Sequence, residues 1–192
     1  MPELNPDCES HDRYPGAGLF EIRVDDLSGE ATRALLAFHL AEMHAGSPPG
    51  HVFALDLSGL QVPAVTVWTV WQGDRIMAIG ALKMLDDGAG ELKSMRTHPD
   101  HLRKGVAGFL LDHMIAVAKK RGLRRLSLET GSGAAFEAAL ALYRTRGFVD
   151  GEAFSDYQRS AFNRFLHLPL ELASHPEPGM PPARSDGPAT LR

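Results

Sequence analysis

The chain has 192 residues, of which 44% are hydrophobic and 23% are charged; this is ordinary for a globular protein and enough for one domain with a sizeable core. Its net charge of −4 does not favour a broad surface for nucleic acid, and its single cysteine, Cys8, excludes an intrachain disulfide and a cysteine-rich metal site. Because the sequence shows neither a membrane-length apolar run nor a signal-peptide pattern, we expect a cytoplasmic protein without a membrane partner.

Composition changes at both ends of the chain. Residues 1–18 and 173–192 are polar and rich in proline and glycine, so neither segment can bury much apolar area. We therefore predict two flexible tails around a single domain at residues 19–172. The sequence contains no internal repeat.

In the N-terminal half, alternating apolar and polar residues predict a strand, and the segment after it has the apolar spacing of a helix. Gly73 and Asp74 stand between two runs rich in β-branched and aromatic residues, which is typical of a hairpin. The predicted elements are a strand at 19–27, helices at 28–46 and 51–60, and strands at 64–72, 75–85 and 90–98.

In the C-terminal half, two helices are each closed by a glycine, Gly122 and Gly147. The predicted elements are a helix at 103–122, a strand at 123–130, a helix at 133–147 and a strand at 164–170. One more strand has room after Gly147. Three consecutive antiparallel strands followed by helix, strand and helix predict an α+β fold around a mixed, mostly antiparallel sheet.

The stretch "PDHLRKGVAGFL" at residues 99–110 concentrates charge and glycine where the long helix begins. Gly105 and Gly108 allow a tight turn, and Arg103 and Lys104 add positive charge. The first N–H groups of a helix have no partner within it and lie at the positive end of its dipole. The stretch therefore predicts a site for a phosphate or pyrophosphate, with a solvated helix start and packing glycines as the alternative.

The segments "HPDHLRKGVAGFL" and "ALYRTRGF" resemble the GNAT superfamily of acyl-CoA-dependent N-acetyltransferases. The signature of that family, [Q/R]-x-x-G-x-[G/A], falls on residues 102–107, where Leu102 replaces Gln or Arg. One side-chain contact to the phosphates is therefore missing, unless Arg103 supplies it. The chain is especially similar to small bacterial members with "ELKSMRT…HLRKGVA" and "LSLETGS…LY…GF".

The resemblance implies a GNAT fold, in which helices flank a central sheet that is splayed at an acetyl-CoA site. In the family, backbone N–H groups of the basic turn hold the CoA pyrophosphate, and the preceding strand binds the pantetheine arm through its backbone. The Met95 N–H matches the family position that polarises the acetyl carbonyl and would steady the developing oxyanion. The residues carried over are Met95, Thr97, Arg103, Lys104, Gly105, Val106, Ala107 and Gly108.

Tyr143 is the candidate general acid. Family tyrosines at this position protonate the departing CoA thiolate, and a phenol with a pKa of about 10 is suited to that transfer. The alternative is a half-buried aromatic on an amphipathic helix. Phe136 stands where the family often has an asparagine that touches the cofactor, so that contact is absent.

Glu91 and Glu129 are the candidate general bases, needed because an ammonium cannot attack a thioester. Glu91 opens its strand close to the position of the glutamate base in the histone-acetylating branch of the family. Strand alternation places Lys93 on the same face, and pairing with it would weaken the base. Glu129 should reach the cleft where the strands part. A water relay, or two solvated strand carboxylates without a catalytic role, are the alternatives.

The resemblance predicts an acetyl-CoA-dependent N-acetyltransferase that acts on the primary amine of a small molecule or amino acid by direct attack in a ternary complex. Residues 41–50 and 151–165 should line the acceptor pocket. No metal site is expected, because the histidine spacings do not suit one. An acyl-CoA-binding sensor or interaction module without turnover is the alternative. The sequence does not fix the oligomeric state, and a homodimer is compatible with it.

Overall fold

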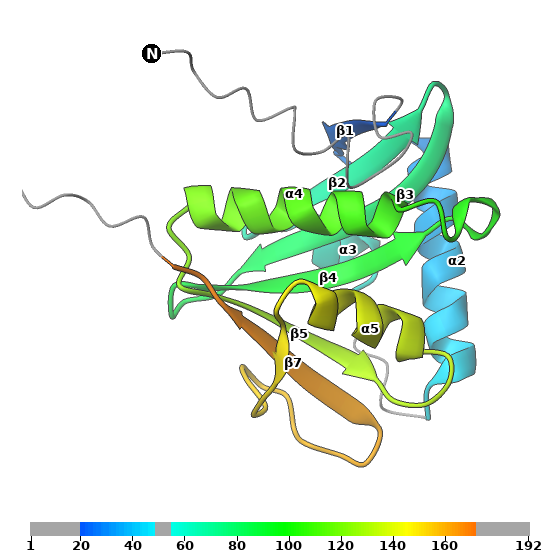
Figure 1. The fold of residues 1–192 in the computed structure, drawn as a ribbon. Coiled ribbons are helices and arrows are strands. Elements are labelled where there is room, and N and C mark those ends of the chain that lie inside the picture. Colours follow the sequence, from blue (N-terminus) through cyan, green and yellow to red (C-terminus); the bar gives the residue numbers. More distant parts are fainter. Residues whose placement is uncertain (1–19, 49–54, 172–192) are drawn as a thin grey trace, which may run out of the picture.

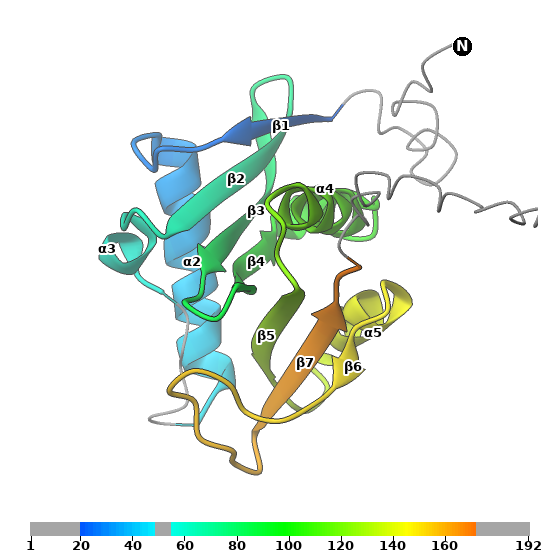
Figure 2. The ribbon, with the colours of Figure 1, turned by 90° about the vertical axis from the view of Figure 1, so that its left-hand side faces the viewer.

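The computed structural model describes residues 20–48 and 55–171, and these form a layered α+β domain. A central sheet separates α4 and α5 on one face from α2 and α3 on the other (Figures 1 and 2). The elements are β1 (Glu21–Val24), α2 (Glu30–Gly46), α3 (Leu57–Leu60), β2 (Val65–Gln72), β3 (Arg75–Met84), β4 (Ala89–Thr97), a short 3-10 helix (Pro99–His101), α4 (Val106–Lys120), β5 (Arg125–Gly131), α5 (Glu137–Thr145), β6 (Val149–Asp150) and β7 (Asn163–Pro169).

The element order confirms the fold class, the hairpin and the extra strand after Gly147. The seven strands lie in the order β1-β2-β3-β4-β5-β7-β6, and β4 with β5 is the parallel pair among antiparallel neighbours. The helix expected at 51–60 is seen at Leu57–Leu60; residues 51–54 lie outside the described part of the chain, as do Cys8 and the expected tails. Within the described segments, no helix combines the length and apolar character that crossing a membrane requires.

Each face of the sheet carries its own apolar core. Leu110, Leu111 and Met114 of α4 are fully buried against one face. On the other face, Leu35 and Leu36 of α2 are buried in a separate cluster. Because strand side chains alternate between the two faces, the central strands β3 and β4 contribute to packing against α4 on one face and α2 on the other.

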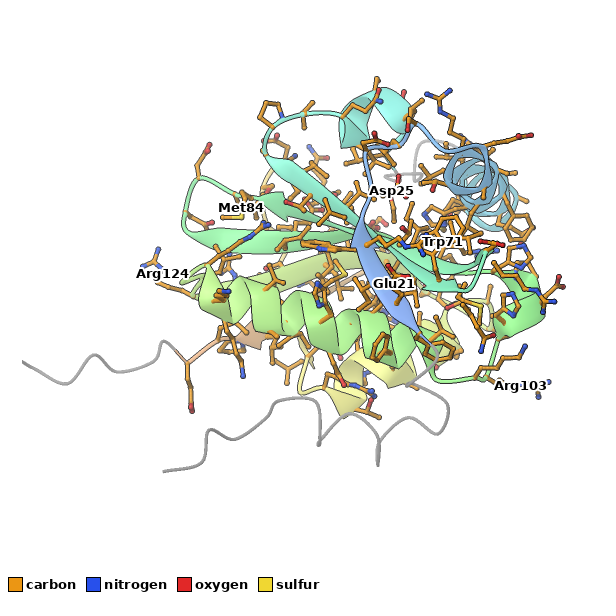
Figure 3. The ribbon with its side chains drawn as sticks, turned by 90° about the horizontal axis from the view of Figure 1, so that it is seen from above. Glu21, Asp25, Trp71, Met84, Arg103 and Arg124 are labelled. Carbon is orange, nitrogen blue, oxygen red and sulfur yellow. The ribbon has the colours of Figure 1, made fainter. Side chains whose placement is uncertain are left out.

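Asp25, which follows β1, fixes the start of α2 to the sheet (Figure 3). Its Oδ2 accepts hydrogen bonds from Thr32 of α2 at 2.8 Å and from Thr69 of β2 at 3.0 Å. Its Oδ1 accepts the backbone N–H of Leu27 at 2.7 Å. These bonds define where α2 starts on the sheet, and the C-terminal half of α2 carries side chains of the site described below.

Strands β4 and β5 are paired for only three residues each. The register runs from Ala89 opposite Arg125 to Glu91 opposite Ser127, after which the two strands diverge (Figure 1). The sheet is therefore open between 92–97 of β4 and 128–131 of β5. This confirms the splay that the family resemblance predicted.

A bulge in β4 accompanies this opening. Between the pairs Ala81–Lys93 and Ile79–Arg96, β4 has one residue more than β3, so that Ser94 and Met95 oppose Gly80. Ser94 has a left-handed backbone with φ of 52°, which costs energy for a residue other than glycine. A Cβ at Gly80 would lie 2.6 Å from Met95 Sδ, so glycine makes room for the bulge.

We predict that Gly90→Ala destabilises the fold by about 1–3 kcal/mol, the usual cost of overpacking a well-packed core. The new Cβ would lie 2.8 Å from the Cδ1 atoms of Leu123 and Leu82, which are themselves buried. Urea unfolding measures the effect. Gly46→Ala is the control, because a Cβ there has no neighbour within 4 Å and alanine favours the helix. Equal stability of Gly90→Ala and wild type would show that the β4–β5 junction is loosely packed.

Candidate active site

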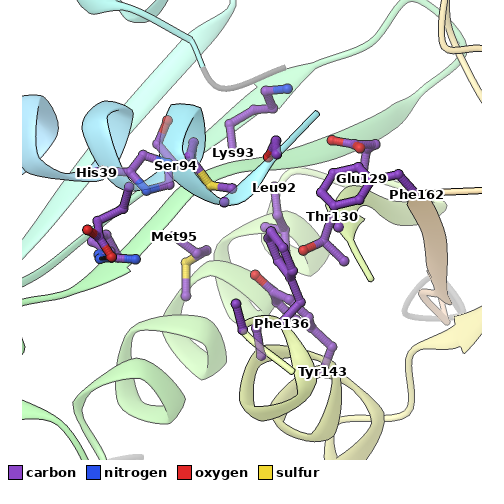
Figure 4. A pocket seen from close by; sticks show the side chains of 18 residues that line it. His39, Leu92, Lys93, Ser94, Met95, Glu129, Thr130, Phe136, Tyr143 and Phe162 are labelled. Atoms are coloured by element: carbon purple, nitrogen blue, oxygen red, sulfur yellow. Dashed lines mark ion pairs between the residues drawn. The ribbon is translucent and has the colours of Figure 1, made fainter. Parts of the chain in front are cut away.

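A pocket of about 220 Å³ fills the opening between β4 and β5 (Figure 4). Residues from α2, β4, β5, α5 and the connection before β7 line it. They are His39, Glu42, Met43, Gly46, Ser47, Leu92, Lys93, Ser94, Met95, Arg96, Glu129, Thr130, Gly131, Ala135, Phe136, Ala139, Tyr143 and Phe162. Because α2 and α5 cover opposite faces of the sheet, the pocket is bounded from both sides.

Three of the residues singled out from the sequence, Met95, Glu129 and Tyr143, line this pocket. The two segments that were expected to line an acceptor pocket also contribute residues to this pocket. Segment 41–50 does so through its described part, and segment 151–165 does so through Phe162. Glu91, Thr97 and the basic turn do not line it. The structure therefore brings the predicted acid and one predicted base into the same pocket and leaves the other base outside.

Tyr143 lies on α5, and 7% of the residue is exposed. Its ring packs edge-on against Phe148, and the two ring centroids are 5.6 Å apart. Burial raises the pKa of its phenol above the usual value of 10. The hydroxyl therefore stays protonated near neutral pH. A protonated phenol bordering the pocket can donate a hydrogen bond or a proton to a group placed there.

Glu129 lies on β5 beside the opening. Burial raises the pKa of its carboxyl to about 7; Lys93 acts to lower that pKa and Glu91 to raise it. A carboxyl with this pKa exchanges its proton close to physiological pH, which suits a general base. The expectation that Glu129 reaches the cleft is confirmed by its place in the pocket wall.

Glu91 is almost fully buried, with 2% of its surface exposed. Its Oε1 lies 3.2 Å from Lys93 Nζ, which confirms the pairing expected from strand alternation. The same oxygen accepts a hydrogen bond of 2.5 Å from the hydroxyl of Tyr157, and Lys93 donates to that hydroxyl at 2.6 Å. This buried cluster attaches the connection before β7 to β4.

Tyr157 and His39 were missed by the sequence reasoning. Tyr157 lies in an irregular segment without a motif, where only its aromatic character among polar neighbours marks it. Its pKa is raised by burial and by the hydrogen bond to Glu91.

His39 lies on α2, and the sequence marked it only as a histidine whose spacing does not suit a metal site. Burial, with the charges of Arg96 and Lys93, lowers the pKa of His39 to about 4, so it is neutral.

The basic turn has the geometry expected of an anion site. Arg103 and Gly105 both have left-handed backbones, with φ of 60° and 79°. Gly105 is the N-cap of α4 and provides no side-chain cap, so the first N–H groups of this helix are left for another acceptor. Arg103 lies at the opposite end of α4 from Arg124 (Figure 3). Leu102, in place of the family Gln or Arg, is 57% exposed.

A second hollow of about 730 Å³ continues from this turn between α4 and α5. It is lined by Gly105, Gly108, Asp112, Ile115, Leu142, Thr145 and Arg146. Arg146 and Asp112 form an ion pair of 3.1 Å across it. The turn and the hollow lie on the same face of the sheet as α5, from which Tyr143 reaches the first pocket. No cluster of three His, Cys, Asp or Glu residues suited to a metal ion occurs within 20–48 and 55–171.

Comparison with known proteins agrees with this geometry. Residues 32–148 match the model of the acetyltransferase (GNAT) family. The chain belongs to the GNAT family. It is 51% identical over 152 residues to the uncharacterized N-acetyltransferase YedL of Escherichia coli (79% of this chain, 96% of YedL). It is also 51% identical over 145 residues to the uncharacterized N-acetyltransferase YsnE of Bacillus subtilis (76% of this chain, 96% of YsnE).

Solved structures give the same fold. A Klebsiella pneumoniae protein described as an acyl-CoA N-acyltransferase superposes with a TM-score of 0.68 at 28% identity, covering 80% of this chain and 99% of its own. A Bacillus subtilis acetyltransferase, solved in complex with CoA, superposes with a TM-score of 0.57 at 18% identity, covering 79% and 99%. The protein is therefore an acyltransferase of the GNAT fold, and enzymes of this family use acetyl-CoA.

We predict that Gly105→Asp abolishes CoA binding measured by calorimetry. The added carboxylate would lie at the start of α4, where it would repel phosphates and occupy the free N–H groups. Gly122→Asp, at the other end of α4, is the control: its φ of 70° gives a similar backbone strain. If Gly105→Asp binds CoA as tightly as wild type, the pyrophosphate binds elsewhere.

Proposed function

We propose that the protein is an acetyl-CoA-dependent N-acetyltransferase that acetylates the primary amine of a small molecule or amino acid by direct attack in a ternary complex. The observation that carries this proposal is the pocket between the diverging strands β4 and β5. Tyr143 borders it from the face of α5, and the α2 residues border it from the opposite face. An acyl donor and an acceptor can thus approach one reaction centre from the two faces of the sheet.

In this proposal, acetyl-CoA extends from the basic turn along β4 to the pocket. The basic turn, residues Arg103, Lys104, Gly105, Val106, Ala107 and Gly108, would hold the pyrophosphate, and Met95 and Thr97 of β4 would bind the pantetheine arm through their backbone. Met95 lies in the β4 bulge and lines the pocket, which supports Met95 N–H as the group facing the acetyl carbonyl. When bound, acetyl-CoA supplies an acetyl group already activated as a thioester.

Two side chains then divide the proton transfers between them. The Glu129 carboxylate accepts the proton of the acceptor ammonium, so that a free amine can attack the thioester carbonyl. The Met95 N–H steadies the negative charge on the carbonyl oxygen. The Tyr143 hydroxyl donates its proton as the C–S bond breaks and the sulfur leaves as a thiol. The attacking nitrogen loses its second proton as the amide forms, and this proton restores the Tyr143 hydroxyl. Glu91 has a positioning role, because its contacts with Lys93 and Tyr157 hold the wall of the pocket.

A panel of amines tests turnover by the release of free thiol from acetyl-CoA. We predict that Tyr143→Phe lowers kcat by about 10²- to 10⁴-fold, the usual contribution of a positioned general acid, while its affinity for acetyl-CoA is unchanged. The substitution removes one oxygen and keeps the ring against Phe148, so the loss is confined to the transition state. If the Tyr143→Phe variant turns over at the wild-type rate while chemistry is rate-limiting, Tyr143 is only an aromatic residue of the core. If the protein binds acetyl-CoA tightly but no amine of the panel releases thiol, the result would instead support an acyl-CoA-binding sensor without turnover.

We predict that the ratio of kcat/KM between wild type and Glu129→Gln depends on pH. Glu129 must be ionised to act as a base, and its pKa is about 7. As the pH increases toward 7, the ratio should therefore increase about tenfold per pH unit, and above pH 7 it should become constant. Taking the ratio with one amine cancels the ionisation of the amine itself. Glu137→Gln, an exposed change on α5, should give a flat ratio. A flat ratio for Glu129→Gln would favour the water relay.

A further inference from the structure

Unpartnered polar atoms gather around the pocket. Six side-chain nitrogen or oxygen atoms of the described residues are shielded from solvent and have no hydrogen-bond partner. Four of the six belong to residues of the pocket wall, namely His39 Nδ1, Ser47 Oγ, Ser94 Oγ and Arg96 Nε. Buried polar groups are paired in the great majority of cases, so this concentration indicates groups that are paired by what the pocket binds.

His39 and Ser94 are the most enclosed of these groups, with 5% and 7% of their surfaces exposed. Both lie on the α2 and β4 side of the pocket, apart from Glu129 and Phe162 on the far side (Figure 4). Ser94 also has the left-handed backbone noted above. Strain of this kind persists where the surrounding structure holds a residue in a required position.

Arg96 brings positive charge to this side of the pocket. Its guanidinium lies over the ring of Phe38, 4.6 Å from the centroid, and one terminal nitrogen lies 3.4 Å from Glu42 Oε2. The Nε–H is left without a protein partner. A guanidinium held in a fixed plane with a free N–H edge is suited to bind a carboxylate.

The other charges near the pocket fit a zwitterion. Lys93, the second cation in the wall, is engaged by Glu91 and Tyr157, and His39 is neutral. Arg96 with the two serine hydroxyls therefore makes a side rich in donors, which also holds the Glu42 carboxylate paired with Arg96, and Glu129 makes an acidic side. The pocket between them has a volume of about 220 Å³.

We propose that the acceptor is a small amine that also carries a carboxylate, such as a free amino acid, with its carboxylate bound by Arg96, Ser94 and Ser47 and its amine facing Glu129. This inference rests on the proposed function, because it names the substrate class of the same pocket. Arg96 is then the residue that determines specificity. The carboxylate also supplies acceptors for the unpartnered N–H and O–H groups.

Matched pairs of L-amino acids and their carboxamides test the inference, since the amide lacks the carboxylate charge. The amide also has a less basic amine, which favours its attack and so works against the expected preference for the acid. Thiol release from acetyl-CoA should show at least a tenfold higher kcat/KM for the acids. Arg96→Gln should remove this preference mainly through KM, and Arg96→Lys should keep part of it. Arg23→Gln is the matched control, because Arg23 also pairs with a glutamate and lies over an aromatic ring but is remote from the pocket.

A binding measurement separates this inference from the proposed function. Calorimetry with unacetylated CoA present, where no transfer can occur, should detect the acids and not the amides, and Arg96→Gln should lose that binding. If acids bind in this way but no amine is ever acetylated, the inference stands and the proposed function fails. If acids and amides are acetylated equally well by wild type, the function stands and the carboxylate site is overturned.

Discussion

The separation of β4 from β5 is the constraint on which the rest of this structure depends. A sheet normally leaves no room between neighbouring strands, because each is hydrogen-bonded to the next. Here the pairing stops after Glu91 and Ser127, and the bulge at Ser94 and Met95 alters β4 just beyond that point. The result is an opening through the centre of the domain. Residues of α2 and α5, which cover opposite faces of the sheet, both line this opening.

Much of this arrangement could be predicted from the sequence because it is encoded locally. The hairpin, the helices and the basic turn follow from periodicity and from glycine positions, and Tyr143 stands a fixed distance before Gly147. The cluster around Glu91 could not be predicted in full, since Tyr157 is 66 positions away and only tertiary packing brings it there. The bulge was equally hidden, because Ser94 gives no sign of a left-handed backbone.

The two candidate bases illustrate how environment divides similar side chains between different tasks. Both glutamates lie on neighbouring strands near the opening, and the sequence left the choice between them open. Glu91 is satisfied by a cation and a phenol, so its charge is committed to holding the structure together. Glu129 is only partly buried, and desolvation raises its pKa to about 7 although Lys93 acts to lower it. Carboxylates whose environments differ in this way commonly serve different roles in one site.

The two sides of the pocket also differ in what kind of group defines them. On the side of α5, the wall is mostly apolar and carries the Tyr143 hydroxyl; its residues are Ala135, Phe136, Ala139 and Tyr143. On the side of α2 and β4, the wall carries polar side chains, among them His39, Ser47 and Arg96. Because α2 is fixed at its start by Asp25, its far end can carry different side chains on an unchanged scaffold. Family membership fixes the fold but does not name the acceptor.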